Sequence, residues 1–169
     1  MKQLGIRYGL IAGGVYVIIG LINLMFNLSA QGGLMSILLL IVPFGVTFAI
    51  VYIAVKELRE ETGSLTTGQG VKLGVTIGLV AALLSSVFTI IYTQLIDPNV
   101  MADQLAATVE GWENQGMTDE AIERALKFAE PFMQLSFAIP ITIISYVIGG
   151  LIKGAISGAI LKQEEKVSN

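Results

Sequence analysis

Residues 73–96 read LGVTIGLVAALLSSVFTIIYTQLI, a run of 24 residues without a charged side chain. A helix rises about 1.5 Å per residue, so roughly 20 apolar residues cross the hydrocarbon core of a membrane. Because backbone polar groups in that core must be paired within the segment, a run of this kind predicts a membrane-spanning helix.

Three further stretches have the same character, namely residues 8–28, 34–55 and 132–152, the last of which extends to residue 161 if Lys153 is accepted within it. We expect the long side chain of Lys153 to reach the headgroups, because it stands near the end of its span. The sequence therefore predicts an all-α membrane protein, a four-transmembrane-helix bundle forming a single transmembrane domain over residues 1–169.

Positive charge is distributed unevenly around these spans. Eight of the ten basic residues fall on one side, namely Lys2, Arg7, Lys56, Arg59, Lys72, Lys153, Lys162 and Lys166, and only Arg124 and Lys127 fall on the other. Basic residues concentrate on the cytoplasmic side of membranes. The pattern predicts a multi-pass protein of the cell inner (plasma) membrane with both termini in the cytoplasm.

One alternative concerns the first span. Lys2 and Arg7 followed by an apolar run also fit a signal peptide that is cleaved near Leu28-Ser29-Ala30. The apolar core of a signal peptide is usually about 7–15 residues long, which is shorter than this run, so we favour a retained helix.

The composition limits the function. The chain is 54% hydrophobic and 14% charged, whereas soluble domains are about one quarter charged. It has no histidine and no cysteine, which removes common metal ligands, disulfides and thiol or imidazole catalysis. A pI near 4.9 argues against nucleic acid as a partner. We therefore assign no catalytic, cofactor or metal-binding residue and expect a protein that is not an enzyme.

Glycines recur at every fourth position on three of the spans. These candidate helix-packing residues are Gly5, Gly9 and Gly13, then Gly70, Gly74 and Gly78, and finally Gly150, Gly154 and Gly158. Such small residues let helix backbones approach closely, as in a glycine zipper. All three stripes lie toward the predicted cytoplasmic side, where we expect the bundle to be tightest. The pattern leaves open whether they pack within one chain or between the copies of a homo-oligomer.

An internal similarity relates the two halves of the chain. Residues 5–13, GIRYGLIAG, and residues 70–78, GVKLGVTIG, share the pattern G-x-basic-x-G-x-x-x-G. Pro43 precedes Lys56, and Pro140 precedes Lys153, by the same 13 residues. The similarity favours two parallel helical-hairpin repeats, as in some transporters. Shared glycine-rich composition is the alternative.

The segment 97–131 carries eight acidic and only two basic residues, and it is predicted to lie outside the cytoplasm. Asp97-Pro98 is typical of a helix start, Gly116 of a helix end, and Thr118 of a second start. We expect an amphipathic helical hairpin. In one interpretation its apolar faces pack on each other or on the bundle. In the other they bind an extracytoplasmic protein partner through the candidate contacts Met101, Leu105 and Trp112.

Two pairs of glutamates in this segment also raise the hypothesis of a metal-binding site. Glu110 with Glu113, and Glu120 with Glu123, have the spacing of paired carboxylate ligands. Ordinary i,i+4 ion pairs from Glu120 to Arg124 and from Glu123 to Lys127 account for two of them, so we favour a solvated face.

Two functional classes remain. Neutral polar residues stand within the spans, namely Asn23, Thr47, Ser85, Ser86, Thr89, Tyr92, Thr142, Ser145 and Tyr146. A dry interior would favour a scaffold, accessory or sensory subunit that acts through helix, lipid and partner contacts, which is the leading hypothesis. A wet cavity lined by these residues would favour the alternative, a small neutral-solute channel or transporter subunit.

Several segments also resemble an uncharacterised bacterial family of four-span membrane proteins, defined as a domain of unknown function. The resemblance rests on LGIRYGLIAG at residues 4–13, KELR at 56–59 leading to GQGVKLG at 68–74, IDP at 96–98 and GMTDE at 116–120. It covers nearly the whole chain and implies a bacterial inner membrane protein. It supplies no functional residues.

Overall fold

The structure is a computed structural model that describes residues 1–26, 28 and 33–162. Four long helices, α1 (Lys2–Phe26), α2 (Gly33–Thr62), α3 (Thr67–Ile91) and α6 (Leu135–Leu161), are long and apolar enough to cross a membrane. The predicted all-α membrane bundle is confirmed. The proposed cleavage site at Ser29-Ala30 and the basic residue Lys166 lie outside the described residues.

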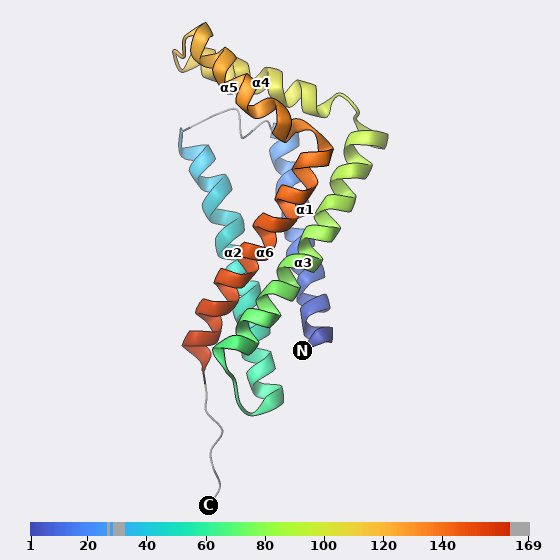
Figure 1. The fold of residues 1–169 in the computed structure, drawn as a ribbon, viewed down its shortest axis with the longest axis vertical. Helices are drawn as coiled ribbons and strands as arrows, with labels where there is room; N and C mark the ends of the chain where they lie inside the picture. Colours follow the sequence, from blue (N-terminus) through green and yellow to red (C-terminus); the bar gives the residue numbers. More distant parts are fainter. Residues whose placement is uncertain (27, 29–32, 163–169) are drawn as a thin grey trace, which may run out of the picture.

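The long helices alternate in direction (Figure 1). α1 and α3 run away from the end that holds the N-terminus, and α2 and α6 run back toward it. Two shorter helices, α4 (Val100–Asn114) and α5 (Asp119–Met133), lie across the opposite end. We call these the terminal end and the hairpin end. Both helical hairpins, α1–α2 and α3–α6, thus have the same orientation.

The interface between α3 and α6 is built from glycine backbone. A Cβ atom placed on Gly70 would stand 2.6 Å from the carbonyl oxygen of Gly154 and 2.7 Å from Cα of Gly158. One placed on Gly74 would stand 2.8 Å from Cα of Gly154 and closer still to the carbonyl oxygen of Gly150. Side chains do not fit at these distances, so the two glycine stripes set how closely α3 and α6 pack.

The glycines of α1 face α3 in a different way. Gly9 lies against Val80, and a Cβ atom on Gly13 would stand 3.1 Å from Cα of Ala81. Gly5 accommodates the methyl group of Thr76. The similar stripes of α1 and α3 therefore differ in role, because α1 receives side chains of α3 whereas α3 meets the bare backbone of α6. All these contacts lie within one chain.

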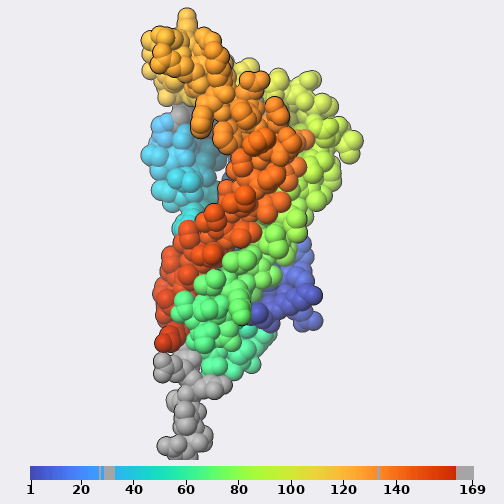
Figure 2. Space-filling model, viewed as in Figure 1, coloured from blue at the N-terminus to red at the C-terminus, as the bar shows by residue number. Residues whose placement is uncertain are grey.

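The buried core lies toward the terminal end. Its members include Leu4, Val51, Ala54, Val55, Leu58, Leu65, Leu73, Ile77 and Leu161. Arg7 of α1 forms an ion pair with Glu57 of α2, which also accepts a 2.6 Å hydrogen bond from the Tyr8 hydroxyl. Toward the hairpin end, the first half of α2 (light blue) stands apart from α6 (orange), as Figure 2 shows. The four helices are therefore joined at one end and diverge at the other.

The predicted hairpin is present, with two corrections at its start. α4 begins at Val100 instead of Asp97-Pro98, and Asn99 holds the N-cap position. The reason is that α3 continues into a π-helical turn, Tyr92–Ile96, closed by the Asp97 N–H donating to the Tyr92 carbonyl at 2.8 Å. The Asp97 carboxylate instead accepts the Asn99 N–H at 3.1 Å.

The second half of the hairpin also departs from expectation at its end. Thr118 caps α5 by accepting the Ala121 N–H, and Gly116 has a φ of 81°, both as predicted. Pro131 lies in the last turn of α5, which continues to Met133, beyond the predicted end of the hairpin at residue 131. The chain extends at Gln134, and α6 begins at Leu135 instead of Phe132.

Candidate functional site

A buried lysine lies in the middle of the bundle. Lys153 of α6 is only 4% exposed, so the expectation that its side chain reaches the headgroups is wrong. Its ammonium group meets Thr47 near the middle of α2 and Tyr16 near the middle of α1. An ionisable group therefore lies beside the middle of α1 and α2. Lys153 points inward because it shares one face of α6 with Gly150 and Gly154, and that face packs against the other helices.

Lys153, Thr47 and Tyr16 are hydrogen-bonded to one another. Lys153 donates to Thr47 Oγ1 at 2.6 Å and to the Tyr16 hydroxyl oxygen at 3.3 Å. Thr47 donates to the Pro43 carbonyl at 2.6 Å, so at its 3.2 Å contact with Tyr16 it is the acceptor. Two of the three ammonium protons thus have hydrogen-bond acceptors among the described residues.

Aromatic rings complete the surroundings of the ammonium group. Lys153 Nζ lies 4.7 Å from the centroid of the Phe44 ring, within cation–π range. The Tyr16 ring stacks on Tyr146 with centroids 4.1 Å apart. Within the described part of the chain, none of the ion pairs includes Lys153. The charge is therefore held by hydroxyls and rings from α1, α2 and α6.

Lys153 borders a cavity of about 420 Å³ between α1, α2 and α6, here called the lysine cavity. Its walls are largely apolar, and include Ile19, Leu39, Leu40, Pro43 and Phe44. Gly149 leaves room beside the ammonium group, because a Cβ atom there would stand 3.8 Å from Nζ. Leu40 lines the cavity and is 73% exposed, so the cavity reaches the outer surface of the bundle.

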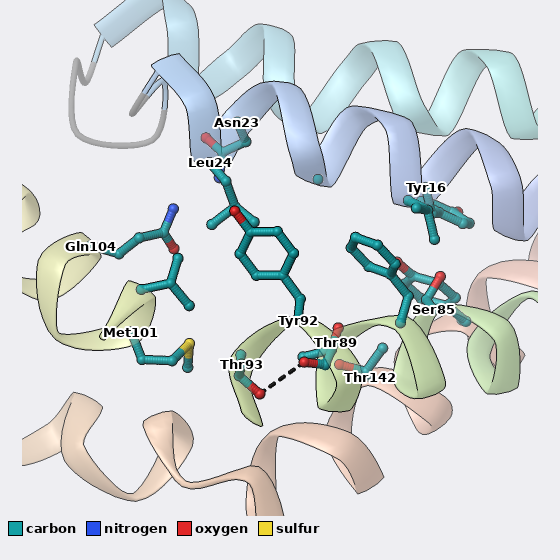
Figure 3. A pocket seen from close by; sticks show the side chains of 15 residues that line it. Tyr16, Asn23, Leu24, Ser85, Thr89, Tyr92, Thr93, Met101, Gln104 and Thr142 are labelled. Carbon is teal, nitrogen blue, oxygen red and sulfur yellow. Dashed lines mark hydrogen bonds between the residues drawn. The ribbon is translucent and has the colours of Figure 1, made fainter. Parts of the chain in front are cut away.

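A second cavity of about 260 Å³, here called the hairpin cavity, lies between α1, α3, α4 and α6 (Figure 3). Tyr92 and Thr93 of the π-helical turn line it, and Gln104 of α4 points into it. The Gln104 side-chain nitrogen is buried and has no hydrogen-bond acceptor among the described residues. Buried amide groups are nearly always satisfied, so this nitrogen fits a site that takes up polar molecules.

The two cavities share four lining residues. Tyr16, Gly20, Asn23 and Tyr146 border both. A Cβ atom on Gly20 would meet nothing within 4 Å, so this glycine leaves space open. The stacked tyrosines are therefore a common wall between a polar chamber under the hairpin and the cavity that reaches Lys153.

Most polar residues identified in the spans gather at these cavities. Seven line one or both, namely Asn23, Ser85, Thr89, Tyr92, Thr142, Ser145 and Tyr146. Thr47 binds Lys153, and Ser86 is buried. Sequence reasoning missed Tyr16, Thr93, Gln104 and the inward position of Lys153. The signal for Lys153 was present, because it stands three residues after Gly150 and so lies on the glycine face.

The candidate partner contacts of the hairpin lie in different places. Met101 lines the hairpin cavity, whereas Leu105 and Trp112 are half-buried on α4. The most exposed aromatic side chain of the hairpin is instead Phe128 of α5, 75% exposed, whose ring packs 5.4 Å from that of Phe132.

Two glutamates of α5 form the expected ion pairs. Glu120 binds Arg124 at 2.6 Å and Glu123 binds Lys127 at 2.8 Å. Residues 1–26, 28 and 33–162 contain no group of three or more acidic side chains positioned to hold a metal ion. The two ion pairs lie on the exposed surface of α5.

Comparison with known proteins gives one match. Neither a curated protein nor a solved structure matches the chain. Residues 7–163 match the family described as "Protein of unknown function (DUF4199)". Because this match covers most of the 169 residues, the chain belongs to that family of proteins of unknown function.

Proposed function

We propose that this chain is a non-enzymatic integral membrane protein that binds a small solute between its helices, as a channel or transporter subunit. The observation that carries the proposal is Lys153, a cation buried at the middle of the bundle and bordering an open cavity. A charged group within a membrane is costly, and such groups commonly mark ligand or ion pathways.

The shape of the interior supports solute binding over a purely structural role. A scaffold that acts through helix contacts needs a dry, filled interior, whereas this bundle holds cavities of about 420 Å³ and 260 Å³. Sites for small molecules are typically about 300–1,000 Å³ and carry a few polar groups on apolar walls. The presence of Lys153 widens the proposal from neutral solutes to solutes that bear an acceptor or an anionic group.

The proposal includes a location in the cell inner membrane with both termini in the cytoplasm. Lys153 does not support this orientation, because its side chain is buried inside the bundle. Seven basic residues still flank the cytoplasmic ends of the spans against Arg124 and Lys127 on the other side, which supports this orientation.

The chain has no cysteine, so single cysteines can test whether water-borne solutes enter the cavities. Thr142→Cys lies in the hairpin cavity, and Ile144→Cys, on the same helix, replaces a side chain that is 57% exposed on the outside of the bundle. We expect a charged methanethiosulfonate reagent to modify position 142 and not position 144, because a thiol surrounded by hydrocarbon meets no charged reagent. Equal inertness of both thiols would contradict solute entry.

A cavity-filling variant makes this test specific. Gly20→Leu fills space that both cavities share. Gly45→Leu adds the same side chain on α2, at a position that lines neither cavity. Both glycines leave room for a larger side chain, because a Cβ atom at either position would have no neighbour within 4 Å. We expect Gly20→Leu to slow modification of Thr142→Cys and Gly45→Leu to leave it unchanged.

Contact with a protein partner, or with a second copy of the chain, is a second candidate function. The observation that favours it is the exposed aromatic pair Phe128 and Phe132 on α5. A photoreactive phenylalanine at position 128 should form a discrete crosslinked product in cells, whereas one at Glu113, an exposed residue of α4, should not. A product of twice the chain mass indicates a homo-oligomer, and no product at either position contradicts this function.

A further inference from the structure

The described residues form no ion pair with Lys153. Its polar contacts are the neutral hydroxyls of Thr47 and Tyr16, at 2.6 Å and 3.3 Å, and its nearby ring is Phe44. The described carboxylates that form ion pairs, such as Glu57, pair with other cations. Because buried charges are normally paired, this site is electrostatically complementary to an anion.

The third ammonium proton is the group that an anion would bind. A lysine ammonium has three N–H donors, and Thr47 and Tyr16 take two of them. Lys153 itself lines the lysine cavity, and Gly149 leaves space beside Nζ. A single carboxylate placed there would accept a charge-assisted hydrogen bond, which is about twice as strong as a neutral one.

The rest of the lysine cavity is suited to hydrocarbon. Five of its twelve lining residues have purely hydrocarbon side chains, namely Ile19, Leu39, Leu40, Pro43 and Phe44. The cavity opens past Leu40, which is 73% exposed on the surface that a membrane-spanning bundle presents to lipid. Figure 2 shows that the first half of α2, which contains Leu39 and Leu40, stands apart from α6. A molecule can therefore enter from the bilayer without crossing the tightly packed terminal end.

We propose that the lysine cavity binds a single-chain amphipathic carboxylate that enters sideways from the bilayer, with its headgroup on Lys153 and its alkyl chain against Ile19, Leu39 and Phe44. This inference rests on the proposed function and specifies its solute class. Its three supports are the ammonium group, which forms no ion pair with the described residues, the apolar wall and the opening toward lipid. A free inorganic anion would satisfy only the first of them.

Equilibrium binding of radiolabelled dodecanoate to the detergent-solubilised full chain tests the proposal, with dodecanol as the uncharged ligand of equal chain length. We expect dodecanoate to bind at least about tenfold more tightly, which corresponds to about 1.4 kcal/mol. Lys153→Met should remove this preference while dodecanol binding persists. Lys153→Arg keeps the charge and should retain part of the preference.

Gly20→Leu and Gly45→Leu form the matched pair for the cavity. Gly20→Leu should weaken binding of both ligands because it occupies the cavity and leaves the Lys153 residue in place, and Gly45→Leu should weaken neither. If Lys153→Met does not fold, the comparison of dodecanoate with dodecanol on the unmodified chain decides the question alone.

The outcomes separate this inference from the proposed function. Equal binding of dodecanoate and dodecanol would overturn the anionic headgroup while leaving a ligand site in place. Binding of dodecanoate that Gly20→Leu does not affect would overturn the location. Failure of both ligands, together with an inert Thr142→Cys, would overturn the proposed function itself.

Discussion

The rings of Tyr16 and Tyr146 stack with their centroids 4.1 Å apart, and both rings line both cavities. Tyr16 also accepts a hydrogen bond from Lys153 at 3.3 Å. The stacked pair thus links the wall between the cavities to the buried cation. The pair is a direct contact between α1 and α6, which are far apart in sequence.

Removal of one stacked ring should join the two cavities. We expect Tyr146→Ala to speed modification of Leu39→Cys in the lysine cavity by a water-soluble thiol reagent, because the common wall is lost. Tyr146→Phe keeps the ring, so Leu39→Cys should be modified at about the same rate as in the chain that retains Tyr146. An unchanged rate in Tyr146→Ala would show that the tyrosines do not separate the cavities.

Replacing Lys153 by methionine should stabilise the protein. Exchange of a buried charge for an apolar side chain of similar length is often neutral or stabilising by about 1–4 kcal/mol. Thr47 and Tyr16 remain satisfied, because Thr47 still donates to the Pro43 carbonyl and still accepts from Tyr16. We therefore expect Lys153→Met to raise the thermal unfolding temperature in detergent.

Lys153→Ala provides the contrast for this prediction, because it removes the charge and also the aliphatic stem. It should unfold at a lower temperature than Lys153→Met. If methionine destabilises the fold as much as alanine does, the lysine is a structural link between α1, α2 and α6 instead of a site retained for function.

The glycine interface of α3 and α6 should not tolerate a methyl group. Gly74→Ala places a Cβ atom 2.8 Å from Cα of Gly154, so the helices must move apart. Overpacking of this kind costs about 1–3 kcal/mol. Gly14→Ala is the control, because a Cβ atom there meets nothing within 4 Å and alanine favours a helix interior by about 0.5–1 kcal/mol.

Thermal unfolding of the two variants measures this difference. Gly74→Ala should lower the unfolding temperature, and Gly14→Ala should keep or raise it. A similar response of both would mean that close approach of α3 and α6 does not limit stability.

The orientation in the membrane can be tested with two loop cysteines. Gln115→Cys lies in the loop between α4 and α5, and Ser64→Cys lies between α2 and α3. In intact cells an impermeant maleimide should label position 115, and it should label position 64 only after the membrane is opened. Labelling in the reverse order would place both termini outside the cytoplasm.

The hairpin shows which structural features neighbouring residues in the sequence can predict. Thr118 and Gly116 act as predicted, because capping and positive φ depend on neighbouring residues alone. Asp97 was assigned wrongly, because the π-helical turn of Tyr92–Ile96 moved the helix start. The neighbours of Asp97 in sequence do not reveal that turn, which lies against the hairpin cavity.

The sequence by itself determined the four membrane helices, their alternation and the polar residues available within them. Helix formation in lipid requires only that each backbone group be paired within its own segment. Tertiary structure alone decided that the charge of Lys153 points inward and that the stripe of Gly5, Gly9 and Gly13 meets α3. It also decided that α2 diverges from α6 to leave a cavity. These features depend on how each helix is rotated and which helix it packs against, and on the space that remains between their side chains.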